Sequence, residues 1–161
     1  MNHKTWRAVS RPAVLLTVAL LLSACAANNG SGGVDGFANG WLAAAPEDLH
    51  RDAERAFHRG NYGVAETHYR TIVARDEGDV DAWVGLGASY DMLGRFDLAD
   101  QAYQKALATG KKRAAVLNNM GYSHYLRGDR KKALDALYEA KNLEPGNRRI
   151  QGNIELVTNG G

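Results

Sequence analysis

A 34-residue period runs through most of this 161-residue chain. Gly60, Gly94 and Gly128 are each one period apart, and the same spacing relates three further columns of residues. These columns are Ala65, Ala99 and Ala133; Tyr69, Tyr103 and Leu137; and Leu49, Trp83 and Leu117. A fixed period of about 20–50 residues is typical of stacked-repeat proteins, in which each repeat packs mainly on its neighbours. The period therefore predicts an array of three similar units.

Each copy of the period predicts two helices separated by a glycine. In the middle copy, apolar residues from Trp83 to Tyr90 recur at i, i+3, i+4 and i+7, which marks one face of a helix. Gly94 then ends this helix as a C′ glycine, and a second helix runs on to Gly110. We expect an all-α solenoid over 46–158, with copies at 46–79, 80–113 and 114–147 and a capping helix at 148–158.

The copies resemble the tetratricopeptide repeat. The resemblance implies helix-turn-helix units in which Gly or Ala lets the two helices approach closely and aromatic residues fill the space between neighbouring pairs. The first copy is less typical, with Asp52 and Glu77 where the pattern has Leu and Pro. The positions that carry the resemblance are Trp83, Gly87, Tyr90, Ala99, Tyr103, Gly121, Ala133 and Pro145.

The N-terminus reads as a targeting segment. Lys4, Arg7 and Arg11 precede an apolar run of ten residues at 13–22. A bilayer-spanning helix needs about 20 apolar residues, so this run fits the core of a signal peptide better than a permanent span. The sequence Leu-Ser-Ala-Cys that follows, ending at Cys25, is similar to a bacterial lipobox. The resemblance implies that residues 1–24 are removed and that Cys25 is lipidated at sulfur; the alternative is an uncleaved short anchor with a buried Cys25.

Residues 25–45 are expected to be a flexible tether after the lipidated cysteine, because five glycines deny this stretch a core. Several acyl chains give stable anchoring where one is marginal. Ala26 follows Cys25, whereas Asp at that place would have suggested retention in the inner membrane. The expected location is the cell envelope, lipid-anchored at the outer membrane and facing the periplasm.

Charge and motif content exclude several classes of function. Without residues 1–24 the chain has 17 basic and 18 acidic residues, so no nucleic-acid partner is expected. The sequence contains no catalytic motif and no Cys/His cluster, so neither an enzyme nor a metal is expected, and no cofactor beyond the lipid on Cys25. The enzymatic alternative is a small envelope hydrolase that uses Glu54 and Asp91.

A peptide-binding groove is implied by the tetratricopeptide resemblance, along the first helix of each copy. Its residues suit a protein partner with apolar anchors and a basic residue, and because none is Lys or Arg, a C-terminal carboxylate is not expected to bind. Alternatively, Tyr122 and Tyr125 pack on the capping helix, and Glu54 and Asp91 are solvated acids. The groove positions are His50, Glu54, Phe57, Val84, Ala88, Asp91, Asn118, Tyr122 and Tyr125.

The combination of features is more specific than the repeats alone. A lipobox, a Gly-rich tether and three repeats containing VLNNMGYSHYLRGD, LEPGN and a closing RRIQGNIELV resemble the TadD-type lipoproteins of Flp (Tad) pilus assembly. The resemblance implies a scaffold for protein–protein interaction that helps the secretin or other pilus components assemble. The alternative is an adaptor lipoprotein for outer-membrane protein insertion or for cell-wall enzymes; neighbouring genes for a pilus ATPase and a secretin would favour the first.

Overall fold

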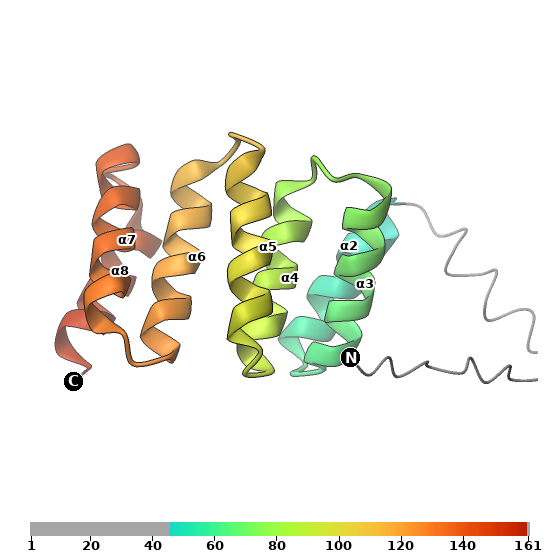
Figure 1. Cartoon of the computed structure of the whole chain (residues 1–161), viewed down its shortest axis with the longest axis horizontal. Helices are drawn as coiled ribbons and strands as arrows, with labels where there is room; N and C mark the ends of the chain where they lie inside the picture. The colour runs from blue at the N-terminus through green and yellow to red at the C-terminus, as the bar shows by residue number, and fades with distance from the viewer. Residues whose placement is uncertain (1–45, 161) are drawn as a thin grey trace, which may run out of the picture.

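The computed structural model describes residues 46–160, which form seven α-helices and no strand. The helices stand side by side in chain order, with α2 and α3 at one end of the array and α7 and α8 at the other (Figure 1). This arrangement confirms the predicted α-solenoid of three helix pairs and a cap. The helices are α2 (Pro46–His58), α3 (Tyr62–Arg75), α4 (Val80–Met92), α5 (Phe96–Ala108), α6 (Arg113–Leu126), α7 (Arg130–Leu143) and α8 (Arg148–Asn159).

The predicted signal peptide (1–24), Cys25 and the tether up to residue 45 lie outside the described residues. Within 46–160, no helix has the length and apolar character needed to cross a bilayer.

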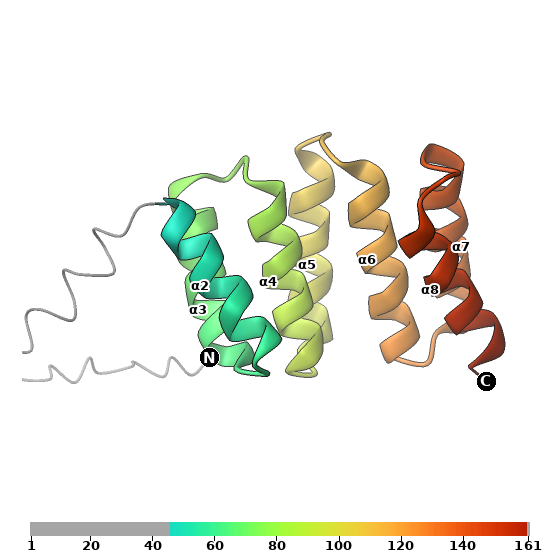
Figure 2. The same ribbon diagram turned by 180° about the vertical axis from the view of Figure 1, so that it is seen from behind.

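The first helices of the pairs form one continuous layer. Each helix packs on the next along the chain, and contacts also join α2 to α4, α4 to α6, and α6 to α8. In the part of the chain that the structure describes, the second helices α3, α5 and α7 make no such contacts with one another. Because the first helices contact one another from repeat to repeat and the second helices do not, the side of the first helices is the inner, concave face of the array; Figure 2 views the molecule from this side.

Glycines allow the helices to approach each other at three places. A Cβ on Gly87 would lie 2.7 Å from the Tyr103 ring within the second pair, and a Cβ on Gly121 would lie 2.6 Å from Leu137 Cγ within the third. The bulky residues at these contacts, Tyr103 and Leu137, are 1% and 0% exposed. Gly87 and Gly121 therefore allow the close approach of two helices that the repeat pattern implied, and the bulky residues Tyr103 and Leu137 fill the contact within each pair.

A third close contact joins neighbouring pairs. A Cβ on Gly85 would lie 2.3 Å from Cζ of Tyr69, which comes from α3 of the preceding pair. The repeat pattern does not reveal Gly85, because the residues one period before and after it, Arg51 and Asn119, are not glycines.

The helices end and begin at the glycines and the capping residue that the sequence predicted. Gly60, Gly94 and Gly128 have φ values of +78°, +70° and +79°, a conformation that glycine adopts at little cost after a helix. Asp129 caps α7, since its side chain accepts a hydrogen bond from the Lys132 backbone N–H at 3.1 Å. The expected stop of each first helix at the repeated glycine is confirmed.

The last helix, α8, buries one face only. Ile150 and Val157, each 1% exposed, pack against the third pair. The positions on α8 that lie one period after Leu117, Gly121 and His124 are Gln151, Glu155 and Thr158, all polar and exposed. Because no apolar face remains for a further helix, α8 closes the array, as a capping unit of a solenoid must.

The glycine contact predicts opposite effects for two alanine substitutions. Gly121→Ala is expected to lower the free energy of unfolding by about 1–3 kcal/mol, because its Cβ would overlap Leu137 Cγ and approach the Ala133 carbonyl oxygen at 3.1 Å. Gly152→Ala, in α8 with nothing within 4 Å of the added Cβ, is expected to raise it by roughly 0.5–1 kcal/mol through helix propensity. Urea denaturation followed by circular dichroism measures both; a stabilising Gly121→Ala would contradict the packing argument.

Candidate functional site

The inner face carries one predicted groove residue per pair at the same helical position. Glu54 on α2 is exposed, Ala88 on α4 is half-buried and Tyr122 on α6 is 37% exposed. These three residues are one period apart, so they lie at the same height on three neighbouring helices. They are accessible to a ligand that lies across the first helices.

Exposed apolar residues extend this line. Met92 and Leu126, 42% and 38% exposed, lie one turn beyond Ala88 and Tyr122 on the same helices. Leu156 on α8, 40% exposed, follows Tyr122 by one period. We call Ala88, Met92, Tyr122, Leu126 and Leu156 the apolar strip. Three of its members, Met92, Leu126 and Leu156, were not predicted from the sequence, although the repeat period relates Met92 to Leu126 and Tyr122 to Leu156.

Three predicted groove residues are largely used in packing. His50 Nε2 lies 2.7 Å from Asp79 Oδ2, while Asp79 Oδ1 caps α4 by accepting from the Ala82 N–H at 2.9 Å. Phe57 makes an edge contact with Tyr62, with ring centroids 5.2 Å apart. Val84 packs against the buried cluster around Tyr103. These contacts hold α2 and α4 in place and leave each side chain partly exposed.

Asp91 is not a solvated acid, and that expectation is wrong. It is 6% exposed; its Oδ2 accepts from Tyr103 Oη at 2.8 Å and its Oδ1 from Ser123 Oγ at 2.6 Å. Arg127 in turn donates to Ser123 Oγ at 2.8 Å and to Asp100 Oδ2 at 2.8 Å. The network ties α4, α5 and α6 together. Both Asp91 oxygens are occupied, so the structure does not offer Asp91 and Glu54 as a pair of accessible catalytic acids.

Burial sets the protonation behaviour of this network. Loss of hydration raises the pKa of Asp91 above its ordinary value, although the hydrogen bonds from Ser123 and Tyr103 act in the opposite direction. Burial, together with the charge and hydrogen bond of Asp91, raises the pKa of Tyr103 well above 10.0. The hydrogen bond from Arg127 lowers the pKa of Asp100.

The C-terminal groove residues divide between packing and exposure. Asn118 is 4% exposed, and its Oδ1 accepts from Asn153 Nδ2 on α8 at 2.9 Å. Tyr125 packs against the cluster of Ala133, Leu137 and Val157, so for Tyr125 the alternative of packing on the cap holds. Tyr122 lies beside it, with ring centroids 6.2 Å apart, and remains exposed.

Among residues 46–160, no group of three or more His, Asp or Glu side chains is arranged to hold a metal ion. The inner face carries the apolar strip, whose side chains are accessible at the surface.

The tetratricopeptide repeat family pattern matches residues 50–114 and 89–147, which together cover more than half of the chain. The chain therefore belongs to the tetratricopeptide repeat family. The TadD-type assignment within this family is finer than the match supports.

The chain is similar to a protein of pilus assembly. The type IV pilus assembly protein PilF of Pseudomonas aeruginosa is 33% identical over 102 residues, which are 62% of this chain and 40% of PilF. The chain therefore spans less than half of the length of this relative. A solved structure of P. aeruginosa PilF superposes with a TM-score of 0.61 at 30% identity, covering 70% of this chain and 52% of that one.

The fold is shared with chaperones of secretion systems. The Yersinia enterocolitica type III secretion chaperone SycD, in complex with a peptide of the translocator YopD, has a TM-score of 0.60 at 21% identity. The match covers 70% of this chain and 91% of that one.

The buried network predicts a pH dependence of stability. Because the folded-state pKa of Asp91 is raised, the native protein binds this proton more readily than the unfolded chain, so acidification down to the ordinary pKa of 3.8 removes a cost of folding. The free energy of unfolding of the wild type, measured relative to Asp91→Asn, is expected to increase between pH 7 and pH 4.

Asp100→Asn is the matched control for this measurement. The pKa of Asp100 is lowered, so its stabilising contribution is present above the unfolded-state pKa and is lost only as the pH falls below 3.8. Relative to Asp100→Asn, the wild type is expected to change little between pH 7 and pH 4 and to lose stability below that range. A decrease for the Asp91 comparison between pH 7 and pH 4 would contradict the assignment.

Proposed function

We propose that this protein is a lipid-anchored periplasmic scaffold in assembly of an Flp (Tad) pilus, and that it holds a partner protein on its inner face. The observation that carries the proposal is the apolar strip, which exposes Met92, Tyr122, Leu126 and Leu156 on one side of a tetratricopeptide array. Contiguous exposed apolar side chains with a polar border are typical of protein-binding surfaces.

Comparison with relatives supports both parts of the proposal. PilF is named as a pilus assembly protein, and the SycD structure contains a peptide of the protein that this chaperone serves. The first likeness favours a role in pilus assembly, and the second illustrates that an array of this shape can hold a segment of a partner. By the same reasoning, the partner of this chain is a pilus-assembly component such as the secretin.

The proposed anchor is the lipid on Cys25. The apolar run at 13–22 and the lipobox-like residues before Cys25 support it, and the 20 residues between Cys25 and Pro46 would let the array stand clear of the lipid headgroups. In this arrangement the repeats face the periplasm from the outer membrane.

Deletion of the gene tests the assembly role, and a surface variant tests the strip. We expect a deletion strain to lack surface pili. The strain complemented with Tyr122→Glu/Leu126→Glu should lack them as well, since an apolar segment bound to the strip would bury two unpaired carboxylates, which costs free energy. Electron microscopy and immunoblotting of the sheared pilin measure piliation. Normal piliation of the deletion strain would remove the proposed role.

The matched control places the same charges on another face. Tyr138 and Leu143 on α7 are 48% and 50% exposed and lie outside the inner layer. Tyr138→Glu/Leu143→Glu should restore piliation, because the added charges do not meet the partner. If both double variants fail equally while remaining folded by circular dichroism, the strip is not the binding surface.

The anchor is tested separately. Cys25→Ser should abolish labelling by radioactive palmitate and leave the protein unprocessed, because the acceptor sulfur is missing. Ser31→Ala, a little further along the chain, serves as the control and should be labelled normally. A Cys25→Ser protein that matures and stays in the membrane fraction like the parent would contradict lipid anchoring.

A further inference from the structure

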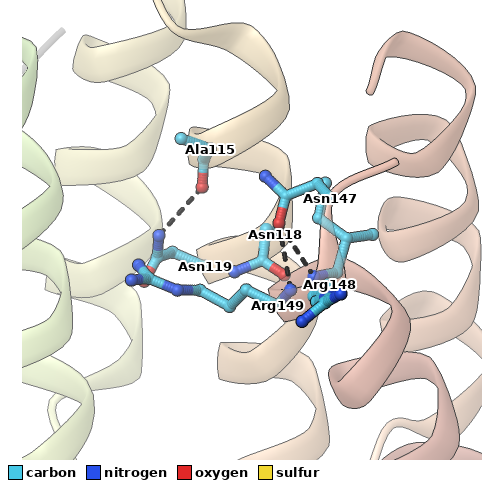
Figure 3. A pocket seen from close by; sticks show the side chains of 7 residues that line it. Ala115, Asn118, Asn119, Asn147, Arg148 and Arg149 are labelled. Carbon is cyan, nitrogen blue, oxygen red and sulfur yellow. Dashed lines mark hydrogen bonds between the residues drawn. The ribbon is translucent and has the colours of Figure 1, made fainter. Parts of the chain in front are cut away.

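A polar pocket lies between α6 and the start of α8, next to the apolar strip. It has a volume of about 410 Å³ and is lined chiefly by Asn118, Asn119, Asn147, Arg148 and Arg149. Figure 3 shows the Arg149 side chain extending from α8 across to α6, beside Asn118 and Asn119. The lining contains no acidic residue.

The two arginines have no partner within the described part of the chain. Their guanidinium groups make neither an ion pair nor a hydrogen bond to any residue of 46–160. Other arginines of the array are paired, such as Arg95 with Glu66 at 2.7 Å and Arg113 with Glu139 at 2.7 Å, although the exposed Arg59 has no ion pair within 46–160. Two unpaired guanidinium groups at one pocket present many donors and no acceptor.

Asn118 adds a buried donor to the pocket. The side chain is 4% exposed, and its Oδ1 is used by Asn153. No residue in 46–160 accepts a hydrogen bond from Asn118 Nδ2. This nitrogen is not completely buried, and Asn118 lines the pocket, so the Nδ2 group is open to it. The backbone N–H groups of Arg149 and Ile150 do not contribute, because Asn147 Oδ1 already accepts from both. The free donors are side-chain groups, and they match the oxygens of an anion.

The charge distribution of the array reinforces this match. Residues 46–109 carry 7 Lys/Arg and 12 Asp/Glu, whereas residues 110–160 carry 10 Lys/Arg and 5 Asp/Glu. The net charge of the array is therefore close to zero only because an acidic N-terminal half balances a basic C-terminal half. The pocket lies in the basic half, where the field attracts an anionic group.

We propose that this pocket binds a carboxylate of the partner segment that the apolar strip holds. The inference rests on the proposed function, because Asn118 precedes Tyr122 by one turn on α6 and Arg149 precedes Leu156 by two turns on α8. A segment with apolar side chains on the strip would thus place a neighbouring acidic group between Arg148, Arg149 and Asn118. Arg–carboxylate contacts of this kind are directional and charge-assisted.

The proposal departs from one expectation from sequence. The nine predicted groove positions contain no Lys or Arg, so binding of a carboxylate was not expected there. Those positions were taken from the three repeats, whereas both arginines belong to the capping helix. In the proposal, the partner segment carries an acidic group next to its apolar anchors.

The test uses three short probes and the full chain labelled with 15N. N-acetyl-Leu-Glu amide carries a side-chain carboxylate, N-acetyl-Leu-Gln carries a terminal carboxylate, and N-acetyl-Leu-Gln amide is the uncharged control. We expect one or both charged probes to shift the side-chain amide resonances of Asn118 and Asn119, with the better probe identifying the source of the carboxylate. Binding should weaken as salt is added, because the site is open to solvent.

Two variants assign the effect to the arginines. Arg148→Gln/Arg149→Gln should weaken the charged probe by about tenfold, the loss expected for removing charge-assisted hydrogen bonds. Arg59→Gln/Lys105→Gln removes the same charge at exposed residues outside the pocket and should bind like the parent. Shifts that the neutral probe reproduces, an absence of shifts with both charged probes, or unchanged binding by the arginine variant would each overturn the proposal.

A lipid headgroup is the competing source of an anion. Flotation with phosphatidylglycerol vesicles, compared with phosphatidylcholine vesicles, tests it: arginine-dependent flotation without probe binding would overturn the proposal in favour of membrane contact. The outcome is separable from the proposed function, since a strip variant that abolishes piliation would leave that function standing even if no carboxylate binds. Conversely, if the probes bind but the deletion strain is normally piliated, the carboxylate site stands and the proposed role in pilus assembly does not.

Discussion

The array depends on close contact between a bulky side chain on one helix and a glycine on another. Tyr103 against Gly87 and Leu137 against Gly121 join the two helices of a pair, and Tyr69 against Gly85 joins one pair to the next. At these places a single added carbon would lie within 3 Å of its neighbour. Protein interiors are packed too densely to absorb such an overlap without movement, so these contacts set the spacing of the helices.

Polar ties between successive pairs add orientation to this packing. Arg95, in the turn after α4, donates to Glu66 on α3, and Arg127, after α6, donates to Asp100 on α5. The two acids are one period apart, so the same position of successive repeats accepts the link, although the arginines that donate to them come from different positions of the turn. Each ion pair has one half-buried and one exposed partner, so each restricts how one helix pair can rotate on the next more than it adds stability. The buried carboxylate of Asp91 makes the second junction more polar than the first.

The inner face combines two chemistries that a partner would meet together. The apolar strip runs over α4, α6 and α8, and the pocket with Arg148 and Arg149 lies where α6 meets α8. The capping helix therefore has two consequences. It covers the last apolar face of the repeats, and it contributes Leu156 and both arginines to the surface available for binding.

The sequence by itself determined the repeat length, the helix pairs, the glycine turns and the cap, because each follows from local periodicity and backbone conformation. It also determined that Tyr103 and Leu137 are buried, since they recur in register with small residues. Only the tertiary structure decided the fate of Asp91 and Asn118. Both lie at positions that face the groove by register, yet Ser123 and Asn153, 32 and 35 residues further along the chain, enclose them. Helical register tells which side of a helix a residue occupies, whereas burial depends on side chains that the next repeat brings, and a period in the sequence does not contain that information.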